Sequence, residues 1–272
     1  MVAILLPIAG PHGIGFLSNQ SFLRLTAMKR TFIFLAAGLL AVGCQKKDPD
    51  VTPRETEDPD WIKLEIKTVF SGDEAYSIWG DIDKTLLVST KAHIFSTSDQ
   101  GKTWQELKNF YGPTYGLLSR NDTIFRLISD YTTNNQGQKM ASFADSFTTD
   151  LGKMWLYTNV VPRGYEKYHT LSQPFGRVEA AGVTYRTQEN TQPIANSTSR
   201  LVVASDLLRT DGAGQTKMRL PAGHYLKGLY LDGQQRLYVA ASGLRFDTTT
   251  GQAIDPTVGR PAVVYVSRRP RP

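Results

Sequence analysis

Residues 97–104 read Thr-Ser-Asp-Gln-Gly-Lys-Thr-Trp, and this stretch decides the fold of the 272-residue chain. It lies between two strand-like runs. Asp99 is suited to accept hydrogen bonds from the amides of its own turn, as in an Asx turn. Gly101 supplies a φ angle that other residues resist, and the ring of Trp104 offers a large apolar surface to the gap between two sheets. The stretch therefore predicts a tight corner between antiparallel strands.

A second stretch repeats this pattern at residues 148–155, which read Thr-Thr-Asp-Leu-Gly-Lys-Met-Trp. Only the seventh position departs, where Met154 replaces the threonine found at position 103. Asp99 and Asp150 are 51 residues apart. A third stretch around Asp211 keeps some of the letters but has no tryptophan, so it carries little weight.

The rest of the chain from Trp61 onward reads as β-hairpins, because apolar residues alternate or form short runs broken by Gly, Asn and Asp. Four hairpins align, each beginning with a small residue and turning at polar residues: 77–88, 116–127, 176–185 and 228–239. Their turns recur on average every 50 residues, although the individual spacings are uneven. A four-stranded propeller blade occupies about 40–50 residues, so the repeat predicts blades.

The two corner stretches resemble the Asp-box, Ser/Thr-x-Asp-x-Gly-x-Thr-Trp, of the sialidase-like (bacterial neuraminidase repeat) propellers. The resemblance implies an all-β fold, a β-propeller of about four antiparallel blades over residues 61–272. It also implies that each box joins the third and fourth strands of a blade, on the face away from the binding site. The alternative is an isolated Asx turn in another all-β sandwich. The matching residues, to which the resemblance gives a structural role, are Thr97, Asp99, Gly101, Thr103 and Trp104, and Thr148, Asp150, Gly152 and Trp155.

The last predicted blade lacks a fourth strand of its own. Residues 262–267 read as a third strand, and the chain then ends in Arg-Arg-Pro-Arg-Pro without a box. Two interpretations stay open. Either the gene is truncated and the propeller incomplete, or the strand at 61–70 supplies the missing edge and closes the ring.

The segment that ends at Cys44, the only cysteine, indicates where the protein resides. Lys29 and Arg30 precede an apolar run at 31–42, which is shorter than the ~20 residues that span a bilayer. This arrangement resembles a bacterial lipoprotein signal peptide, although Ala41 stands where leucine is usual. The resemblance implies cleavage before Cys44 and attachment of lipid to it. The alternative is a short buried or spanning helix.

We interpret Met28 as the true start, so residues 1–43 are an upstream extension plus signal peptide. Residues 44–60 are the lipidated cysteine and a polar, flexible linker. The expected location is the outer membrane, on the cell surface or the periplasmic face, with the membrane as a partner through the lipid anchor.

The net charge of +6 does not indicate a nucleic-acid partner. Residues 1–43 contribute three basic side chains and no acid, and three of the last five residues are arginines. Between these ends the charges balance, and no basic stripe with interleaved aromatic residues occurs. A surface that follows a phosphate backbone is therefore not expected.

No catalytic residue is predicted. The resemblance implies that a true sialidase needs three arginines, a Tyr–Glu pair, an aspartate and an Arg-Ile-Pro segment, and this last segment is absent. Tyr165 and Glu166 are neighbours, and neighbours on a strand point to opposite faces. Six further residues are candidates for a glycosidase site, but a solvated charge or a turn residue is the simpler interpretation of each. They are Arg177, Arg186, Arg200, Arg245, Glu179 and Asp232.

No cofactor or metal is predicted either. The sequence has no glycine-rich phosphate loop, and its four histidines, His12, His93, His169 and His224, have no ligand spacing. We expect a lipid-anchored, non-catalytic propeller that binds a glycan, a peptide or a protein partner. The alternatives are a cell-surface exo-glycosidase of the sialidase-like class and a truncated product without function.

Overall fold

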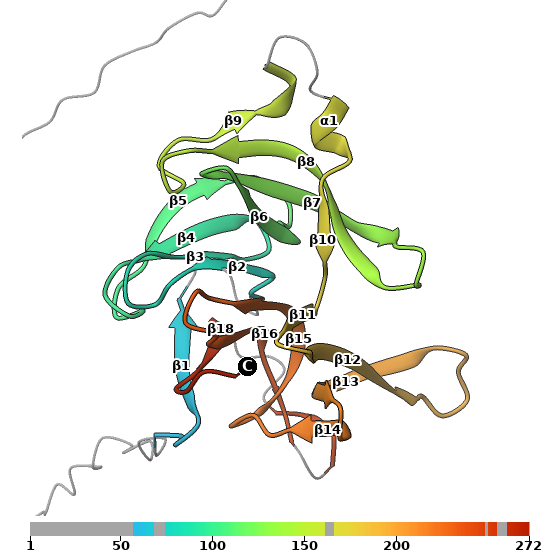
Figure 1. Cartoon of the computed structure of the whole chain (residues 1–272). Helices are drawn as coiled ribbons and strands as arrows, with labels where there is room; N and C mark the ends of the chain where they lie inside the picture. Colours follow the sequence, from blue (N-terminus) through green and yellow to red (C-terminus); the bar gives the residue numbers. More distant parts are fainter. Residues whose placement is uncertain (1–56, 68–73, 161–165, 248–249, 255–259, 272) are drawn as a thin grey trace, which may run out of the picture. The chain divides into compact units, whose positions relative to one another are not determined.

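The computed structural model describes residues 57–67, 74–160, 166–247, 250–254 and 260–271. These residues form four antiparallel sheets arranged as the blades of a β-propeller (Figure 1). The predicted all-β, four-bladed fold is confirmed. All of the described residues belong to one compact unit, Arg54–Pro272.

Each blade runs from an inner strand to an outer one. Blade 1 contains β2 (Ser77–Gly80), β3 (Leu86–Ser89), β4 (His93–Thr97) and β5 (Gln105–Asn109). Blade 2 contains β6 (Gly116–Arg120), β7 (Thr123–Thr133), β8 (Lys139–Thr148) and β9 (Leu156–Tyr157), with β10 (Ser172–Pro174) also paired to β8. Blade 3 contains β11 (Arg177–Ala180), β12 (Val183–Pro193), β13 (Arg200–Asp211) and β14 (Gly214–Met218). Blade 4 contains β15 (Gly223–Leu231), β16 (Leu237–Phe246), β18 (Ala262–Ser267) and β1 (Trp61–Ile66), with β17 (Ala253–Ile254) paired to β16. Two short helices, η1 (Thr158–Val160) and α1 (Glu166–His169), follow β9.

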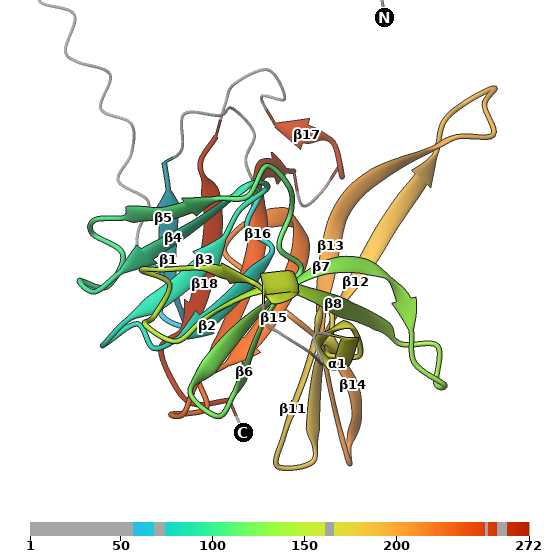
Figure 2. The same cartoon turned by 90° about the horizontal axis from the view of Figure 1, so that it is seen from above.

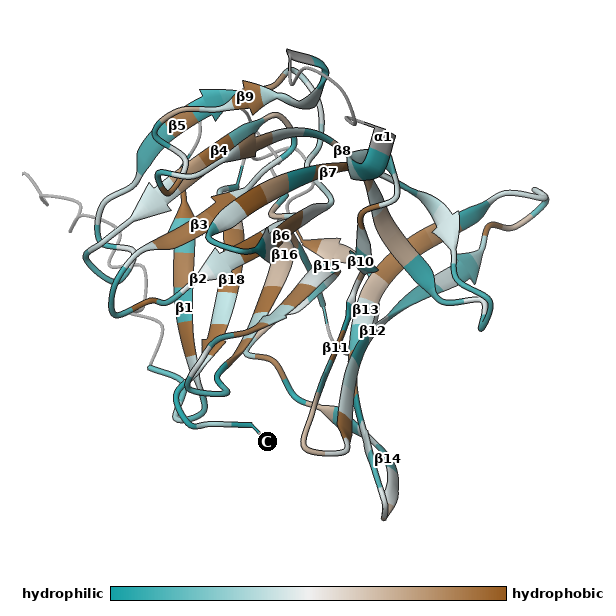
Figure 3. Ribbon diagram, turned by 45° about the horizontal axis from the view of Figure 1, so that its top comes forward, coloured by the Kyte–Doolittle hydropathy of each residue, from teal (hydrophilic) through white to brown (hydrophobic). Residues whose placement is uncertain are grey.

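The N-terminal strand completes blade 4. β1 pairs antiparallel with β18 over its whole length, from Trp61 opposite Ser267 to Ile66 opposite Ala262. Apolar and polar residues alternate along β1 (Figure 3), and Leu64 and Ile66 are buried in the core between blades 4 and 1. Of the two interpretations of the last blade, the structure therefore confirms the one in which the N-terminal strand closes the ring.

Three of the four seams between blades are filled by apolar side chains of the blades themselves. Separate clusters join blades 4 and 1, blades 3 and 4, and blades 1 and 2. The fourth cluster packs the face of blade 2 against Leu171, Tyr168 and Phe175. The segment that leads from α1 to β11 thus takes the place of direct blade contact at the seam between blades 2 and 3.

Two long hairpins extend beyond the blades. They are formed by β7 with β8 and by β12 with β13, and both lie on the side of the propeller away from β1 and β18 (Figures 1 and 2). Each contains a shift of register, between Ser129 and Thr132 in the first and between Gln188 and Asn190 in the second. Such bulges bend a strand and redirect its side chains.

The buried His224 makes the stability of blade 4 depend on pH. Its Nδ1 lies 2.8 Å from the carbonyl oxygen of Ser242, and its Nε2 lies 2.9 Å from the hydroxyl of Tyr265. Burial lowers the pKa of His224 from 6.5 to about 4. The unfolded chain therefore binds more protons between these two pH values, and folded stability is lost as the pH falls through that window. We expect a loss of about 3 kcal/mol in urea unfolding between pH 7 and pH 4 that is absent in His224→Gln. An equal loss in the variant would contradict the assignment.

Candidate functional site

The first predicted corner, residues 97–104, is a closed network of hydrogen bonds around Asp99. The carboxylate accepts bonds from the Thr97 hydroxyl (2.8 Å), the Thr103 amide (2.9 Å) and the Thr103 hydroxyl (2.6 Å). The amide of Gly101, at φ +80°, donates to the Thr97 hydroxyl at 3.0 Å. These bonds, those from Thr103 first, lower the pKa of Asp99 to about 2.

The second corner, residues 148–155, repeats this geometry one blade further on. Asp150 accepts bonds from the Thr148 hydroxyl (2.8 Å) and the Met154 amide (2.9 Å), and the Gly152 amide donates to the Thr148 hydroxyl at 3.0 Å. Met154 has no hydroxyl, so Asp150 lacks the equivalent of the third bond. Both corners join the third strand of a blade to the fourth, β4 to β5 and β8 to β9.

The glycine and tryptophan of each corner pack toward the preceding blade. A Cβ on Gly101 would lie 2.8 Å from Leu64, and a Cβ on Gly152 would lie 2.7 Å from Leu107. Both leucines are on the outermost strand of the preceding blade. Trp104 packs against the core between blades 4 and 1, and Trp155 meets Phe110 edge-on at 5.3 Å. These contacts give the corners a role in joining blades.

Blade 4 has a corner of the same kind that is divided between the two ends of the described chain. Asp58 accepts hydrogen bonds from the amides of Asp60 (2.9 Å) and Trp61 (3.0 Å). Trp61 is 3% exposed and packs against the core between blades 3 and 4, while the Arg268 amide donates to the Asp60 carbonyl at 2.8 Å. The sequence signal for this corner is the Asp-x-x-Trp at 58–61, which our sequence analysis did not use.

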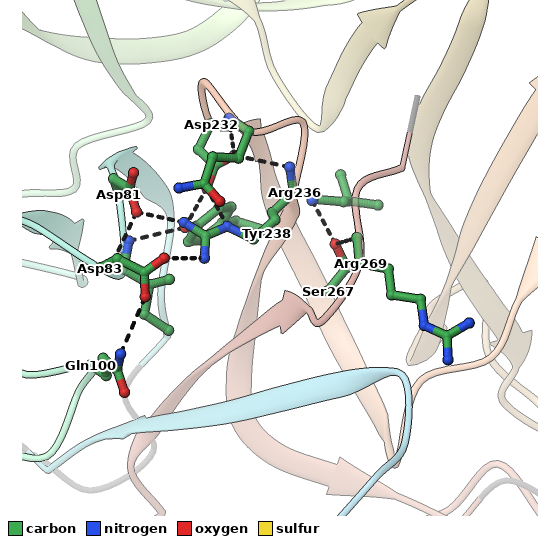
Figure 4. A network of polar contacts seen from close by, with 11 residues as sticks. Asp81, Asp83, Gln100, Asp232, Arg236, Tyr238, Ser267 and Arg269 are labelled. Atoms are coloured by element: carbon green, nitrogen blue, oxygen red, sulfur yellow. Dashed lines mark hydrogen bonds and ion pairs between the residues drawn. The ribbon is translucent and has the colours of Figure 1, made fainter.

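The carboxylate of Asp232 supports the turns that join blades 4 and 1 (Figure 4). It accepts bonds from Arg236 Nε (2.7 Å) and the Tyr238 hydroxyl (2.9 Å), and its side chain is fully buried. The same Arg236 reaches across the seam to Asp81 (2.5 Å) and Asp83 (2.6 Å) in blade 1. This arginine therefore pairs with three carboxylates at once and joins the first blade to the last.

At the other end of the propeller axis, a cavity of about 320 Å³ is lined by residues of all four blades. The inner strands β2, β6 and β15 contain the small residues Ser77, Gly116 and Gly228, and Gly176 directly precedes the inner strand β11. These are the residues that align in the sequence repeat. A Cβ on Gly228 would lie 2.1 Å from the Tyr76 carbonyl oxygen, so small residues are required where the inner strands approach one another.

The residue just before each of these four positions has a large side chain, and we call Tyr76, Tyr115, Phe175 and Lys227 the axial mouth. The first three of these residues line the cavity. Tyr76 meets Tyr115 edge-on at 5.5 Å, and Tyr115 meets Phe175 edge-on at 5.6 Å. The Lys227 ammonium lies 5.2 Å from the centre of the Tyr76 ring. Four large side chains, one from each blade, therefore lie around the propeller axis. The repeat places these residues, but the sequence analysis did not single them out.

Carboxylates and a tyrosine surround the axial mouth, and we call Glu74, Asp130, Glu189 and Tyr225 the polar rim. The Tyr225 hydroxyl donates to Glu189 at 2.5 Å, and the Tyr76 hydroxyl donates to Glu74 at 2.7 Å. Lys227 lies 3.3 Å from Glu74 and 3.9 Å from the centre of the Tyr225 ring. Burial first, and then Glu189, raises the pKa of Tyr225, so its phenol stays protonated and acts as a donor.

A Tyr–Glu pair is thus present, formed by Tyr225 of blade 4 and Glu189 of blade 3. The pair considered in the sequence falls outside the described residues at Tyr165, as does the side chain of Glu166. Within the described part of the chain, the four arginines that we considered have other neighbours. Arg177 binds Glu179, Arg186 binds Gln215, Arg200 binds Thr191, and Arg245 lies opposite His224.

The described residues contain no group of His, Cys, Asp and Glu side chains that could hold a metal ion. No helix in this part of the chain has the length and hydrophobicity needed to cross a membrane. The predictions for Met28, for Cys44 and for residues 44–56 of the linker lie outside the described residues.

No protein-family model and no curated protein matches the chain. Among solved structures, a streptogramin B lyase is similar at 12% identity with a TM-score of 0.22 over 72% of this chain and 58% of the lyase. A mutant of Trypanosoma rangeli sialidase is similar at 19% identity with a TM-score of 0.21, over 66% of this chain and 27% of the sialidase. The protein is a four-bladed β-propeller, distantly similar to the propellers of these enzymes.

Proposed function

We propose that this protein is a lipid-anchored propeller of the cell envelope that binds a glycan, a peptide or a protein partner, without catalysis, at the axial mouth. The observation that carries the proposal is that Tyr76, Tyr115 and Phe175 line a single cavity and that Lys227 lies beside the Tyr76 ring, so each blade contributes one large side chain. Binding sites are typically concave, with aromatic walls and a few convergent polar groups.

The chemistry of the mouth and rim favours binding over catalysis. Aromatic faces supply stacking surface, and the rim supplies donors and acceptors of both charges. The carboxylates of the rim are engaged by Tyr76, Lys227 and Tyr225, and Asp130 is engaged by Lys139 at 2.7 Å.

The end of the propeller at which the N-terminal strand begins is compatible with a lipid anchor at Cys44. β1 begins at Trp61, at the end of the propeller that carries the corners, whereas the axial mouth lies where the inner strands begin, at the opposite end. A tether from a lipidated Cys44 would therefore leave the mouth facing away from the membrane, accessible to a ligand from outside or from the periplasm. This orientation supports an outer-membrane lipoprotein.

The test uses full-length protein, arrays of immobilised oligosaccharides and peptides, and the variants Tyr115→Ala and Lys227→Met. We expect binding to at least one class of probe, with affinity at least about tenfold lower in both variants. The matched control is Tyr157→Ala, because Tyr157 is 49% exposed on the outer strand of blade 2. Expression with labelled palmitate tests the anchor, since incorporation should be lost in Cys44→Ala.

Two outcomes would contradict the proposal. Array signals unchanged in both mouth variants would place the ligand elsewhere. Release of a fluorogenic sialic acid reporter by the wild-type protein, stopped by Tyr225→Phe, would favour the alternative of an exo-glycosidase. That alternative rests on the hydrogen-bonded pair of Tyr225 and Glu189.

A further inference from the structure

A groove of about 490 Å³ lies beside the long hairpin of blade 2, apart from the axial cavity. One wall is formed by β7 and β8, and the other by residues 169–172, which lead from α1 into β10. We call it the side groove. Its volume lies within the range of small-ligand sites, about 300–1,000 Å³.

The side groove contains an aromatic platform that is held in a strained conformation. Phe143 has a φ of 65° and, among the described residues, is the only residue other than glycine with a positive φ inside a strand. Its ring stacks on His169, with centroids 4.2 Å apart and planes at 21°, while 39% of Phe143 is exposed. The Phe143 amide donates to the Leu171 carbonyl at 3.2 Å, which joins β8 to the segment that follows α1 at this position. A bulky side chain in this region of φ is unfavourable, and such strain concentrates at functional sites.

The polar side chains of the side groove carry hydroxyl and amide groups. They include Ser129, Thr132, Asn134, Ser142, Thr170 and Ser172. The hydroxyls of Thr132 and Ser142 lie 2.9 Å apart. The described residues that line the groove carry no carboxylate, ammonium or guanidinium group. Apart from the imidazole of His169, which is covered by the ring of Phe143, the described lining therefore offers no cationic group to a phosphate, a sulfate or a charged peptide.

We propose that the side groove binds a neutral saccharide, with the apolar face of one pyranose ring on Phe143 and its hydroxyls bonded to the threonine and serine side chains. A sugar ring has one apolar face and a periphery of hydroxyl groups, and this matches a platform surrounded by short neutral donors and acceptors. An acyl chain would bury these hydroxyls without partners, which costs free energy. The proposal is independent of the axial mouth and of its ligand.

The experiment titrates full-length protein with cellotriose, chitotriose and maltotriose as neutral probes and with 3′-sialyllactose as the charged probe. Isothermal calorimetry measures affinity, and the NMR signals of the His169 ring report the site. We expect at least one neutral probe to bind and to shift the His169 signals, with sialyllactose weaker. Phe143→Gly should reduce the affinity at least tenfold without lowering the melting temperature, because glycine relieves the strained φ.

The matched control is Leu151→Gly. Leu151 also has a positive φ, 60°, and is 44% exposed, but it lies in the second corner and outside the side groove. It should leave the affinity for the neutral probe unchanged. A second variant, Thr132→Val, should reduce affinity several-fold and keeps the test valid if Phe143→Gly folds poorly.

Three results would overturn the proposal. The first is the absence of binding by every neutral probe at 10 mM, a concentration far above the millimolar Kd of a weak site. The second is tighter binding of sialyllactose than of the neutral probes. The third is unchanged affinity in both Phe143→Gly and Thr132→Val, which would place the saccharide at another surface, such as the axial mouth.

Discussion

Replacing Arg236 with methionine should lower the free energy of unfolding by about 3–5 kcal/mol, because it leaves a buried carboxylate without its cation. Arg236 is bonded to Asp232, Asp81 and Asp83 at 2.5–2.7 Å. Asp232 is fully buried, so water cannot replace the lost partner. The three carboxylates would also repel one another across the seam between blades 4 and 1. Urea denaturation at pH 7, followed by circular dichroism, measures the change.

The matched control is Arg177→Met. Arg177 pairs with Glu179 two positions further along the same strand, β11 of blade 3, and this pair is more exposed to solvent. Exposed pairs contribute about 0–1 kcal/mol, so the control should lose little stability. Equal losses in the two variants would show that the network around Arg236 does not stabilise the seam.

Replacing Gly228 with alanine should destabilise the protein by about 3 kcal/mol, near the upper end of the usual cost of overpacking. The new methyl group would lie 2.1 Å from the carbonyl oxygen of Tyr76, which is a backbone atom. The inner strands β15 and β2 would have to separate, and the axial mouth would open between Lys227 and Tyr76. Thermal and urea unfolding measure the loss, and binding of the array probes should weaken with it.

Gly233→Ala is the matched control for this second variant. Gly233 lies in the hairpin that follows β15, and a Cβ there would meet no atom within 4 Å. A substitution in open space should change stability by less than about 0.5 kcal/mol. Equal losses in the free energy of unfolding for Gly228→Ala and Gly233→Ala would show that the close approach of the inner strands does not restrict the size of the side chain at position 228.

The repeating parts of the fold could be predicted because their cause is local. The corners at 97–104 and 148–155 are fixed by hydrogen bonds between residues at most four positions apart, such as that from Thr103 to Asp99. The aligned hairpins at 77–88, 116–127, 176–185 and 228–239 correspond to the first two strands of each blade. Hydrogen bonds within a turn, and the alternation of apolar and polar residues along a strand, depend on residues that are close in the sequence. A sequence pattern is therefore sufficient to find them.

The candidate site could not be predicted in the same way because its residues meet only when the ring closes. Glu189 and Tyr225 are 36 positions apart and lie on different blades, so a search for neighbouring Tyr and Glu selected Tyr165 and Glu166 instead. Phe143 offers no sequence signal at all, since nothing in its neighbouring residues marks the positive φ that it adopts inside β8. The corner of blade 4 was missed because the spacing between Asp58 and Trp61 differs from that between Asp99 and Trp104.

The pairing of β1 with β18 sets an order of events during biosynthesis. The ribosome delivers Trp61–Ile66 first and the complementary Ala262–Ser267 last, and nascent chains fold domain by domain as they emerge. Throughout elongation, this earliest strand has no partner and its apolar residues Ile62, Leu64 and Ile66 stay uncovered. Chains that stall before residue 262 would therefore keep an unpaired strand through which they can aggregate.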